Sequence, residues 1–290
     1  MKKSLIIKLG ALGDVVRTTT ILNVIDGDIT WFTKENAKPL LENISQVSHI
    51  ASDVQEIRGK YFDTVYNLDD DLEGCEVLDS ISYGRLYGFY ACGGKVLPMP
   101  EAFEWWGMSL NGLSDRDERK QANRKSFQYY LFNNICKTFN GEDYVFGYRP
   151  NKVTENIIGL ESRAGDRWPM KIWPFYSELE DKLKSCGYEI RIFEQRDDIR
   201  DYIRDVNSCR LVVTGDSLAM HIALALKKKA VSIFGPTSPW EIEMYDRGKK
   251  LYADMDCISC FRKSNCDVKP NCMESISVDQ VYGVIEELLK

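Results

Sequence analysis

The stretch "VVTGDSLAMHIALALKKKAVSIFGPTSP", residues 212–239, decides the fold class of this chain. It opens on a short apolar run that ends at "TGDS". A helical segment follows, and a second apolar run, "KAVSIFG", leads into "GPTSP". Two apolar strands joined through a helix predict a β-α-β unit, whose strands are parallel and covered on both faces. The stretch therefore indicates an α/β protein.

The same alternation continues on both sides. In the second half of the chain we expect strands at 156–161, 189–194, 210–216 and 229–235, and helices at 175–187, 198–209 and 217–227. In the first half we expect strands at 5–9, 29–33 and 62–68, and helices at 15–24, 36–44 and 126–139. Because the series restarts near residue 150, the sequence predicts two Rossmann-like domains, 1–150 and 151–290, with parallel sheets that face each other across a cleft. The last helix, 278–289, is expected to cross back to the first domain.

Composition excludes several classes of protein. The chain has 290 residues, of which 44% are hydrophobic, enough for a substantial core. Its net charge is −6 and its pI about 5.2, so nucleic acid is not an expected partner. No apolar run reaches the roughly 18 residues that a membrane span needs. The start, "MKKSLIIKLGALGD", has too short an apolar run for a signal peptide, and a cytosolic protein is expected.

In parallel sheets, ligands bind beyond the carboxyl ends of the strands. After the first strand comes "GALGD", with Gly10, Gly13 and Asp14, which has neither the dinucleotide nor the Walker spacing. Asp14 lies where the helix is expected to begin, so a plain helix cap is one explanation for it. Asp69 and Asp70 in "NLDDD" either bind acceptor hydroxyl groups or form a solvated acidic turn.

The strand ends of the second domain favour a phosphate-bearing ligand. Gly215 permits a tight turn, and Ser217 and Leu218 open a helix whose free N–H groups suit a diphosphate. Each residue also has an ordinary explanation: Asp216 and Ser217 as caps, and His221 as a core histidine. The loop "RAGDRWPMKIWP" adds Arg167 and Lys171, either for phosphate or as solvated loop charges.

The blocks "LIIKLGALGDVVRTT", "RWPMKIWP" and "VVTGDSLAMHIALALKKKAVSIFGPTSP" together resemble the lipopolysaccharide heptosyltransferases, glycosyltransferase family 9, which have the two-domain GT-B fold. The blocks come in the family's order and cover both domains. Residues 72–147 match less closely, and this chain is shorter than the family's core-heptose enzymes. Gly215 also departs from the asparagine that the family often has there.

The resemblance implies an inverting glycosyltransferase whose general base is Asp14. It implies that the first domain binds the acceptor and the second a nucleoside-diphosphate sugar, usually ADP-heptose, with no metal needed for catalysis. The implied donor-binding residues are Arg167, Lys171, Thr214, Gly215, Asp216, Ser217, Leu218, His221, Pro236, Thr237 and Ser238. Gly10 and Gly13 would form the loop that carries the base, and Asp69 and Asp70 are acceptor candidates.

Four of the nine cysteines cluster in "CISCFRKSNCDVKPNC": Cys257, Cys260, Cys266 and Cys272. Four thiolates with a C-x-x-C pair suit a structural zinc or iron ion. Reduced thiols or one disulfide are the alternatives. Such a metal would fix the loop after the donor site and would take no part in the reaction.

Other functions remain open from the sequence. A non-catalytic sugar-nucleotide-binding relative would lack the base or the lysine, whereas Asp14 and Lys171 are both present. A family-9-like transferase with another sugar nucleotide, or a nucleotide-sugar epimerase, is a further alternative. The acceptor could be a lipopolysaccharide core, a lipid-linked sugar or another hydroxyl compound. A lipid acceptor would bring the enzyme to the inner face of the membrane.

Overall fold

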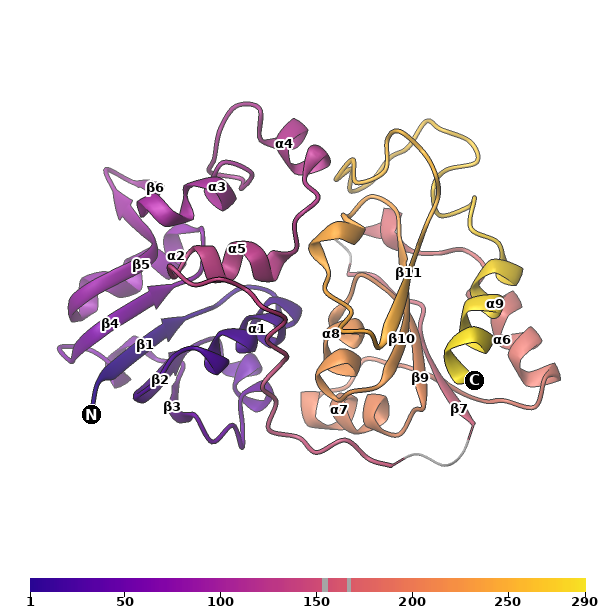
Figure 1. Cartoon of the computed structure of the whole chain (residues 1–290), viewed down its shortest axis with the longest axis horizontal. Helices are drawn as coiled ribbons and strands as arrows, with labels where there is room; N and C mark the ends of the chain where they lie inside the picture. Colours follow the sequence, from indigo (N-terminus) through magenta and orange to yellow (C-terminus); the bar gives the residue numbers. More distant parts are fainter. Residues whose placement is uncertain (153–155, 166–167) are drawn as a thin grey trace. The chain divides into compact units, whose positions relative to one another are not determined.

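The computed structural model describes residues 1–152, 156–165 and 168–290. Internal contacts divide the chain into two compact units (Figure 1). Unit 1 is Met1–Tyr148 and unit 2 is Arg149–Lys290, so the division lies close to the expected one. Each unit is built on its own sheet. The facing arrangement predicted for the two sheets stays a prediction.

Unit 1 has a six-stranded sheet in the order β3-β2-β1-β4-β5-β6. The strands are β1 (Lys3–Ile7), β2 (Asp28–Phe32), β3 (Val47–Ala51), β4 (Tyr61–Asn67), β5 (Ser82–Cys92) and β6 (Lys95–Pro98). All neighbours pair in parallel except β5 and β6. The strand order reverses between β1 and β4, and the carboxyl ends of these two strands form the switch point of the sheet.

The helices of unit 1 are short. They are α1 (Leu12–Thr18), α2 (Leu72–Glu76), α3 (Phe103–Trp106), α4 (Arg116–Ala122) and α5 (Phe127–Asn133). The helix predicted for 15–24 begins earlier, at Leu12, and continues as a 3-10 helix over Thr19–Asn23. The helix predicted for 36–44 is a 3-10 helix, Glu35–Leu40, because Pro39 lies inside it and cannot donate an α-helical hydrogen bond.

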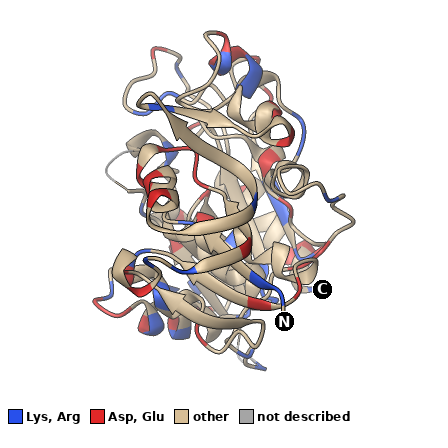
Figure 2. Cartoon of the chain, turned by 90° about the vertical axis from the view of Figure 1, so that its left-hand side faces the viewer, with Lys and Arg blue, Asp and Glu red and all other residues tan. Residues whose placement is uncertain are grey.

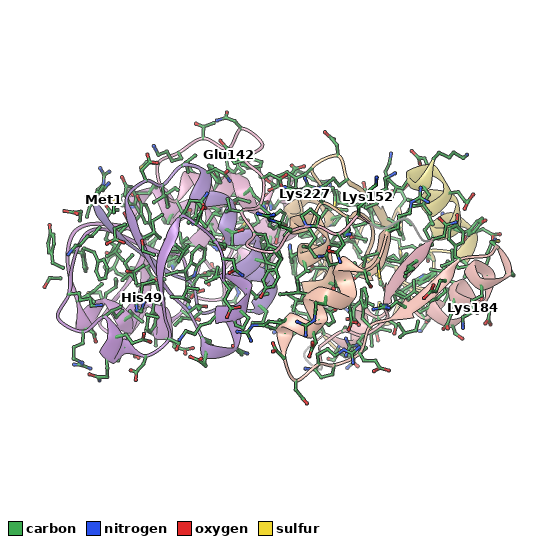
Figure 3. All side chains as sticks on the ribbon, turned by 90° about the horizontal axis from the view of Figure 1, so that it is seen from below. Met1, His49, Glu142, Lys152, Lys184 and Lys227 are labelled. Carbon is green, nitrogen blue, oxygen red and sulfur yellow. The ribbon has the colours of Figure 1, made fainter. Side chains whose placement is uncertain are left out.

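Alternation along the strands builds the core of unit 1. Leu5 and Ile7 of β1 pack with Phe62 and Val65 of β4 and Leu86 of β5 on one face of the sheet. The side chains fill the space between the sheet and its covering segments (Figure 3). Since Lys8 comes directly after β1, its side chain follows the intervening positions onto the other face.

Unit 2 has a five-stranded, fully parallel sheet in the order β11-β10-β9-β7-β8. Its strands are β7 (Ile157–Glu161), β8 (Glu189–Ile192), β9 (Leu211–Gly215), β10 (Lys229–Phe234) and β11 (Gly248–Tyr252). The first four were expected from the sequence. The edge strand β11 was not, because "GKKLY" carries two lysines in place of an apolar run.

Two pairs of helices cover the sheet of unit 2 (Figure 1). The helices are α6 (Tyr176–Ser185), α7 (Ile199–Asn207), α8 (Leu218–Ala225) and α9 (Val278–Leu289). Helices α7 and α8 lie on one face, and α6 and α9 on the other. The expectation that α9 packs on the first domain is corrected: Val281 and Ile285 are fully buried in the core of unit 2, beside Leu179 and Leu183 of α6.

Charges of both signs are interspersed over the ribbon, with no long segment of a single sign (Figure 2). Within the described ranges, no helix has both the length and the apolar character that a membrane span would require.

Candidate functional site

A buried ion pair lies at the switch point of unit 1, between the carboxyl ends of β1 and β4. Lys8 follows β1 and Asp69 follows β4, and Lys8 Nζ lies 2.6 Å from Asp69 Oδ1 with both side chains buried. Lys8 Nζ also donates to the carbonyl of Leu68 at 3.1 Å, and the N–H of Leu9 donates to Asp69 Oδ2. Burial alone would lower the pKa of Lys8, but the carboxylates of Asp69, Asp14 and Asp70 outweigh burial and raise it. Lys8 is therefore a protonated cation within the protein.

Asp14 stands beside this pair, on the first turn of α1. Ala11 is the N-cap of α1, and Asp14 is an acidic residue in the first turn, where a carboxylate also favours the helix dipole. Arg17, one turn later, approaches its carboxylate, with Arg17 Nη2 2.8 Å from Asp14 Oδ1. The Asp14 side chain is 34% exposed, which leaves the carboxylate accessible to a substrate.

Gly10 brings these groups together. A Cβ atom at Gly10 would lie 3.3 Å from Asp69 Oδ1, 3.4 Å from Lys8 Nζ and 3.6 Å from Asp14 Oδ2. A side chain at this position would therefore press on Asp69 Oδ1 and would contact Lys8 Nζ and Asp14 Oδ2. Gly13, in contrast, lies inside α1 and not in the turn, so only the first glycine of "GALGD" shapes the loop.

The two acceptor candidates have different surroundings. Asp69 is buried and binds Lys8 and the Leu9 N–H, so a solvated acidic turn does not describe it, and acceptor binding by Asp69 stays a prediction. Burial raises the pKa of Asp70, while the Lys8 ammonium partly opposes that effect. Asp70 as an acceptor ligand stays a prediction.

In unit 2, polar groups gather at the N-terminus of α8. Ser217 occupies the N-cap position, but its hydroxyl makes no capping hydrogen bond. It instead shares a 2.7 Å hydrogen bond with the buried Thr214 hydroxyl at the end of β9. Lys171 reaches this point from a short 3-10 turn, with its Nζ 3.3 Å from Asp216 Oδ2. A helix N-terminus beside a lysine can bind an anionic ligand such as a diphosphate.

The loop after β10 carries two buried hydroxyl groups. Thr237 Oγ1 and Ser238 Oγ have no hydrogen-bond partner among the described residues. The loop itself is held from the cysteine segment: the Ser259 N–H donates to the carbonyl of Gly235 at 3.1 Å, and the Phe261 N–H to that of Pro236 at 2.8 Å. Buried hydroxyl groups normally have partners, so these two are expected to meet a bound ligand or water.

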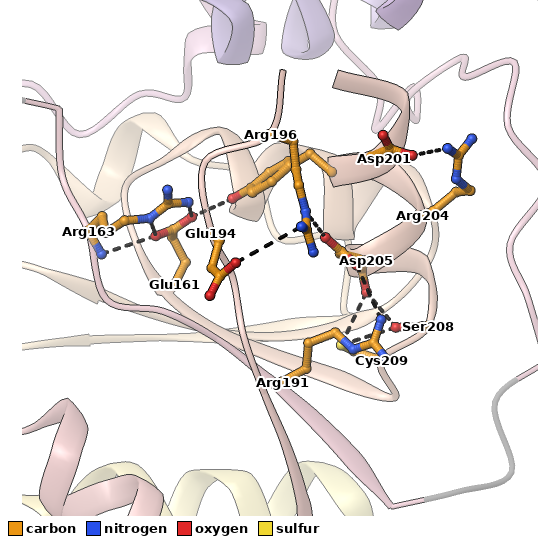
Figure 4. Close-up of polar contacts among 11 residues, drawn as sticks. Glu161, Arg163, Arg191, Glu194, Arg196, Asp201, Arg204, Asp205, Ser208 and Cys209 are labelled. Atoms are coloured by element: carbon orange, nitrogen blue, oxygen red, sulfur yellow. Dashed lines mark hydrogen bonds and ion pairs between the residues drawn. The ribbon is translucent and has the colours of Figure 1, made fainter. Parts of the chain in front are cut away.

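At the end of β7, a third group of charges is internally paired (Figure 4). The buried Glu161 accepts from Arg163 Nε and Nη2, each at 2.8 Å, and from the Tyr202 hydroxyl. Burial and the neighbouring Glu161 carboxylate raise the pKa of Tyr202 well above its ordinary value. Glu161 pairs with Thr214 across β7 and β9, so this network supports the strand end from which the α8 turn begins.

Three further donor candidates lie on or just before α8. His221 is buried on α8, and Leu218 is the first residue of that helix. Gly215 has room around it, since a Cβ there would come no closer than 3.5 Å to a neighbouring atom, the carbonyl oxygen of Lys171. Arg167 lies outside the described residues.

The four clustered cysteines are free thiols. Cys272 packs against Gly235, where a Cβ would lie 2.8 Å from its sulfur. Burial, and then the nearby Cys260, Cys257 and Cys266, raise the pKa of Cys272 to about 11. Among the described residues, no three His, Cys, Asp or Glu side chains are grouped closely enough to hold a metal ion. The structural zinc or iron stays a prediction, which metal analysis of the purified protein would test.

Two site residues were missed in the sequence. They are Lys8 and Arg17, which the sequence did not single out. A lysine directly after a buried strand and an arginine three residues after a loop aspartate were the available signals.

The family model of glycosyltransferase family 9 (heptosyltransferase) matches residues 198–270, which include β9, α8 and β10. Residues 198–270 are therefore similar to glycosyltransferase family 9. This agrees with the resemblance seen in the sequence, and the matched segment contains most of the donor candidates of unit 2.

A curated protein is also similar to part of this chain. Lipooligosaccharide heptosyltransferase 2 of Campylobacter jejuni is 30% identical over 120 residues, which are 39% of this chain and 36% of that protein. The match therefore spans about a third of the relative's length.

Similarity in structure extends over the whole chain. The glycosyltransferase family 9 protein of Veillonella parvula superposes with a TM-score of 0.70 at 17% identity, covering 99% of this chain and 97% of that one. The E. coli heptosyltransferase WaaC with ADP gives 0.68 at 14% identity, with 99% of each chain covered. The chain thus has the two-sheet GT-B fold of these proteins.

Proposed function

We propose that this chain is an inverting glycosyltransferase that transfers a heptose from ADP-heptose to a hydroxyl group of a glycan acceptor. Unit 2 would bind the donor and unit 1 the acceptor. Asp14 would act as the general base. The observation that carries the proposal is the α8 N-terminus, which Ser217 does not cap and beside which Lys171 lies. The loop after the neighbouring strand carries two buried hydroxyls with no partner among the described residues.

The proposed reaction needs one base and one anion site. Asp14 takes the proton of the acceptor hydroxyl as its oxygen forms a bond to the anomeric carbon of the donor sugar. The bond from that carbon to the diphosphate oxygen breaks, and its electron pair leaves with the nucleoside diphosphate. Lys171 and the N–H groups of α8 stabilise the charge that develops there, so no proton donor is needed for the leaving group.

The choice of donor rests on similarity. The matching family model is described as heptosyltransferase, and the E. coli relative was solved with ADP. Lipooligosaccharide, which appears in the name of the C. jejuni relative, is the proposed class of acceptor. A cytoplasmic location, with contact to the inner face of the membrane during work on a lipid-linked acceptor, belongs to the same proposal.

Calorimetry with ADP, UDP, GDP and dTDP tests the donor site. Preference for ADP supports the proposal. Preference for another nucleotide would mean that the donor is a different sugar nucleotide. If the protein binds none of the four nucleotides, the proposed glycosyltransferase activity is contradicted, and a non-catalytic relative is favoured.

Transfer is then followed as ADP release from ADP-heptose, with heptose-free lipooligosaccharide as the acceptor. Asp14→Asn should keep the wild-type affinity for ADP and lose turnover by about 10²- to 10⁴-fold, as expected for removal of a general base. Turnover equal to that of the wild type would exclude Asp14 from this role.

A further inference from the structure

Arg17 is placed unlike an ordinary surface arginine. Its guanidinium lies 3.6 Å from the centroid of the Phe127 ring, and its Nη2 lies 2.8 Å from Asp14 Oδ1. The Arg17 side chain is only 12% exposed. A guanidinium stacked on a ring and shielded from water is held in one orientation, and its charge acts more strongly on its neighbour than an exposed charge would.

The ring on which Arg17 stacks is itself fixed. Phe127 is the first residue of α5 and is buried, with Trp105 packed edge-on at 5.4 Å between ring centroids. Ser126 caps this helix, accepting the N–H of Tyr129 at 3.1 Å. The contact therefore ties Asp14 on α1 to a rigid point on α5.

The other charges around Asp14 largely compensate one another. Lys8 is paired with Asp69, and Asp70 lies within electrostatic range of both. The 3-10 segment that packs on α1 carries Glu35 and Lys38, which pair with each other at 3.2 Å. On α5, the titratable groups are the phenols of Tyr129 and Tyr130, and Tyr130 donates to Asn123. The Arg17 guanidinium is thus a cation in direct contact with Asp14.

The geometry points to Arg17 as a positioning residue that keeps the Asp14 carboxylate ionised and orients it for proton abstraction, using the Phe127 ring as its support. This inference rests on the proposed function of Asp14 as the base. Arg17 does not touch the reacting atoms. It holds Oδ1 of the carboxylate, and the proton of the acceptor hydroxyl passes to Asp14.

Removal of the charge gives a specific signature. In Arg17→Gln, the carboxylate loses an adjacent cation, so Asp14 binds a proton more readily. The acid limb of the pH profile of kcat/KM should move to higher pH by about one pH unit. The plateau of kcat should fall about tenfold because alignment is lost, while KM for ADP-heptose stays unchanged.

A direct titration does not depend on turnover. The side-chain carboxyl carbon of Asp14, followed by ¹³C NMR in the full chain, should titrate at higher pH in Arg17→Gln than in the wild type. Arg17→Lys retains the charge and should keep the titration near that of the wild type. Arg119→Gln is the matched control, because Arg119 makes an exposed 2.8 Å pair with Asp115 on α4; it should leave the Asp14 titration and the pH profile unchanged.

The outcomes separate the inference from the function on which it rests. Suppose that Asp14→Asn is inactive, but that Arg17→Gln shows the wild-type titration of the Asp14 carboxyl group and the wild-type acid limb. The positioning role of Arg17 is then overturned, whereas the role of Asp14 as the base is supported. A lower rate alone would then reflect a structural defect. If Asp14→Asn retains full turnover, Asp14 is not the general base, and the positioning role of Arg17 is excluded as well.

Discussion

The ammonium nitrogen of Lys8 lies 2.6 Å from Oδ1 of Asp69, and this buried pair joins the carboxyl ends of β1 and β4. The two residues are 61 positions apart in the chain. The pair fixes the loop that leads from β1 to Asp14, because Asp69 also accepts the N–H of Leu9. A structural ion pair thus underlies the proposed base.

Breaking this pair should destabilise unit 1 severely. Lys8→Met leaves the Asp69 carboxylate buried without its cation, and the free energy of unfolding should fall by about 3–5 kcal/mol. Urea denaturation of the full chain measures the change. Lys34→Met is the matched control: Lys34 pairs with Glu73 at 2.9 Å, but both side chains are about half exposed or more, so the loss should stay within about 1 kcal/mol. Equal losses for the two variants would contradict the assignment.

Asp70 should make stability depend on pH. Burial raises the pKa of Asp70 in the folded protein, so the folded state binds a proton there more tightly than the unfolded chain does. Stability is therefore lost as the pH rises from about 4, the ordinary value for an aspartate, through the folded-state pKa. Asp70→Asn does not titrate, so it should be more stable than the wild type at pH 7 and lose that advantage below about pH 4.

The control for this variant is Asp117→Asn, on the exposed surface of α4, which should change stability by no more than about 0.5 kcal/mol. Urea denaturation at pH 4 and pH 7 compares the variants. An Asp70→Asn protein that is less stable than the wild type at pH 7 would show that the carboxylate is stabilising.

The buried hydroxyls of Thr237 and Ser238 should matter only when the donor is bound. Without ligand they have no partner among the described residues, so the double variant Thr237→Val, Ser238→Ala should keep the wild-type melting temperature or exceed it. With ADP present, the rise in melting temperature should be smaller than in the wild type. Ser232→Ala is the control, since the Ser232 hydroxyl is also buried without a partner in the described part of the chain but lies within β10. Equal ADP-induced shifts in all three proteins would remove Thr237 and Ser238 from the donor site.

Lys171→Ala should weaken binding of the nucleoside diphosphate. A lysine contact to phosphate is a charged hydrogen bond worth about 1.5–3 kcal/mol, so the dissociation constant for ADP should rise roughly 10- to 100-fold. Calorimetry measures it. Lys184→Ala removes a similar charge from an exposed pair with Glu180 on α6 and should leave affinity unchanged. An unaltered affinity in Lys171→Ala would mean that other groups hold the diphosphate.

Much of the fold could be predicted because strands and helices leave local patterns. The expected strand at 229–235 is β10, and the helix expected at 278–289 is α9 with the same limits. The elements that were missed, β3, β5, β6 and β11, lie toward the edges of their sheets, where polar and aromatic residues replace the apolar run. The strand β5, for example, begins "SYGRLYG", and no apolar alternation marks it.

Local sequence was a poorer guide to what each site residue does. Asp69 was placed correctly at a strand end, yet its burial could not be read from "NLDDD". Whether a carboxylate is solvated or paired depends on which strand lies next to it, and the sheet order puts β1 beside β4 although two strands separate them along the chain.

The sequence by itself determined the α/β class, the division into two units and the strand ends at which ligands are expected, because hydrophobic periodicity and turn residues act over a few positions. Only the tertiary structure decided which charges meet. The pairing of Lys8 with Asp69 and the stacking of Arg17 on Phe127 join segments that are distant in the chain. Such contacts depend on strand order and helix packing, which no short stretch of sequence encodes.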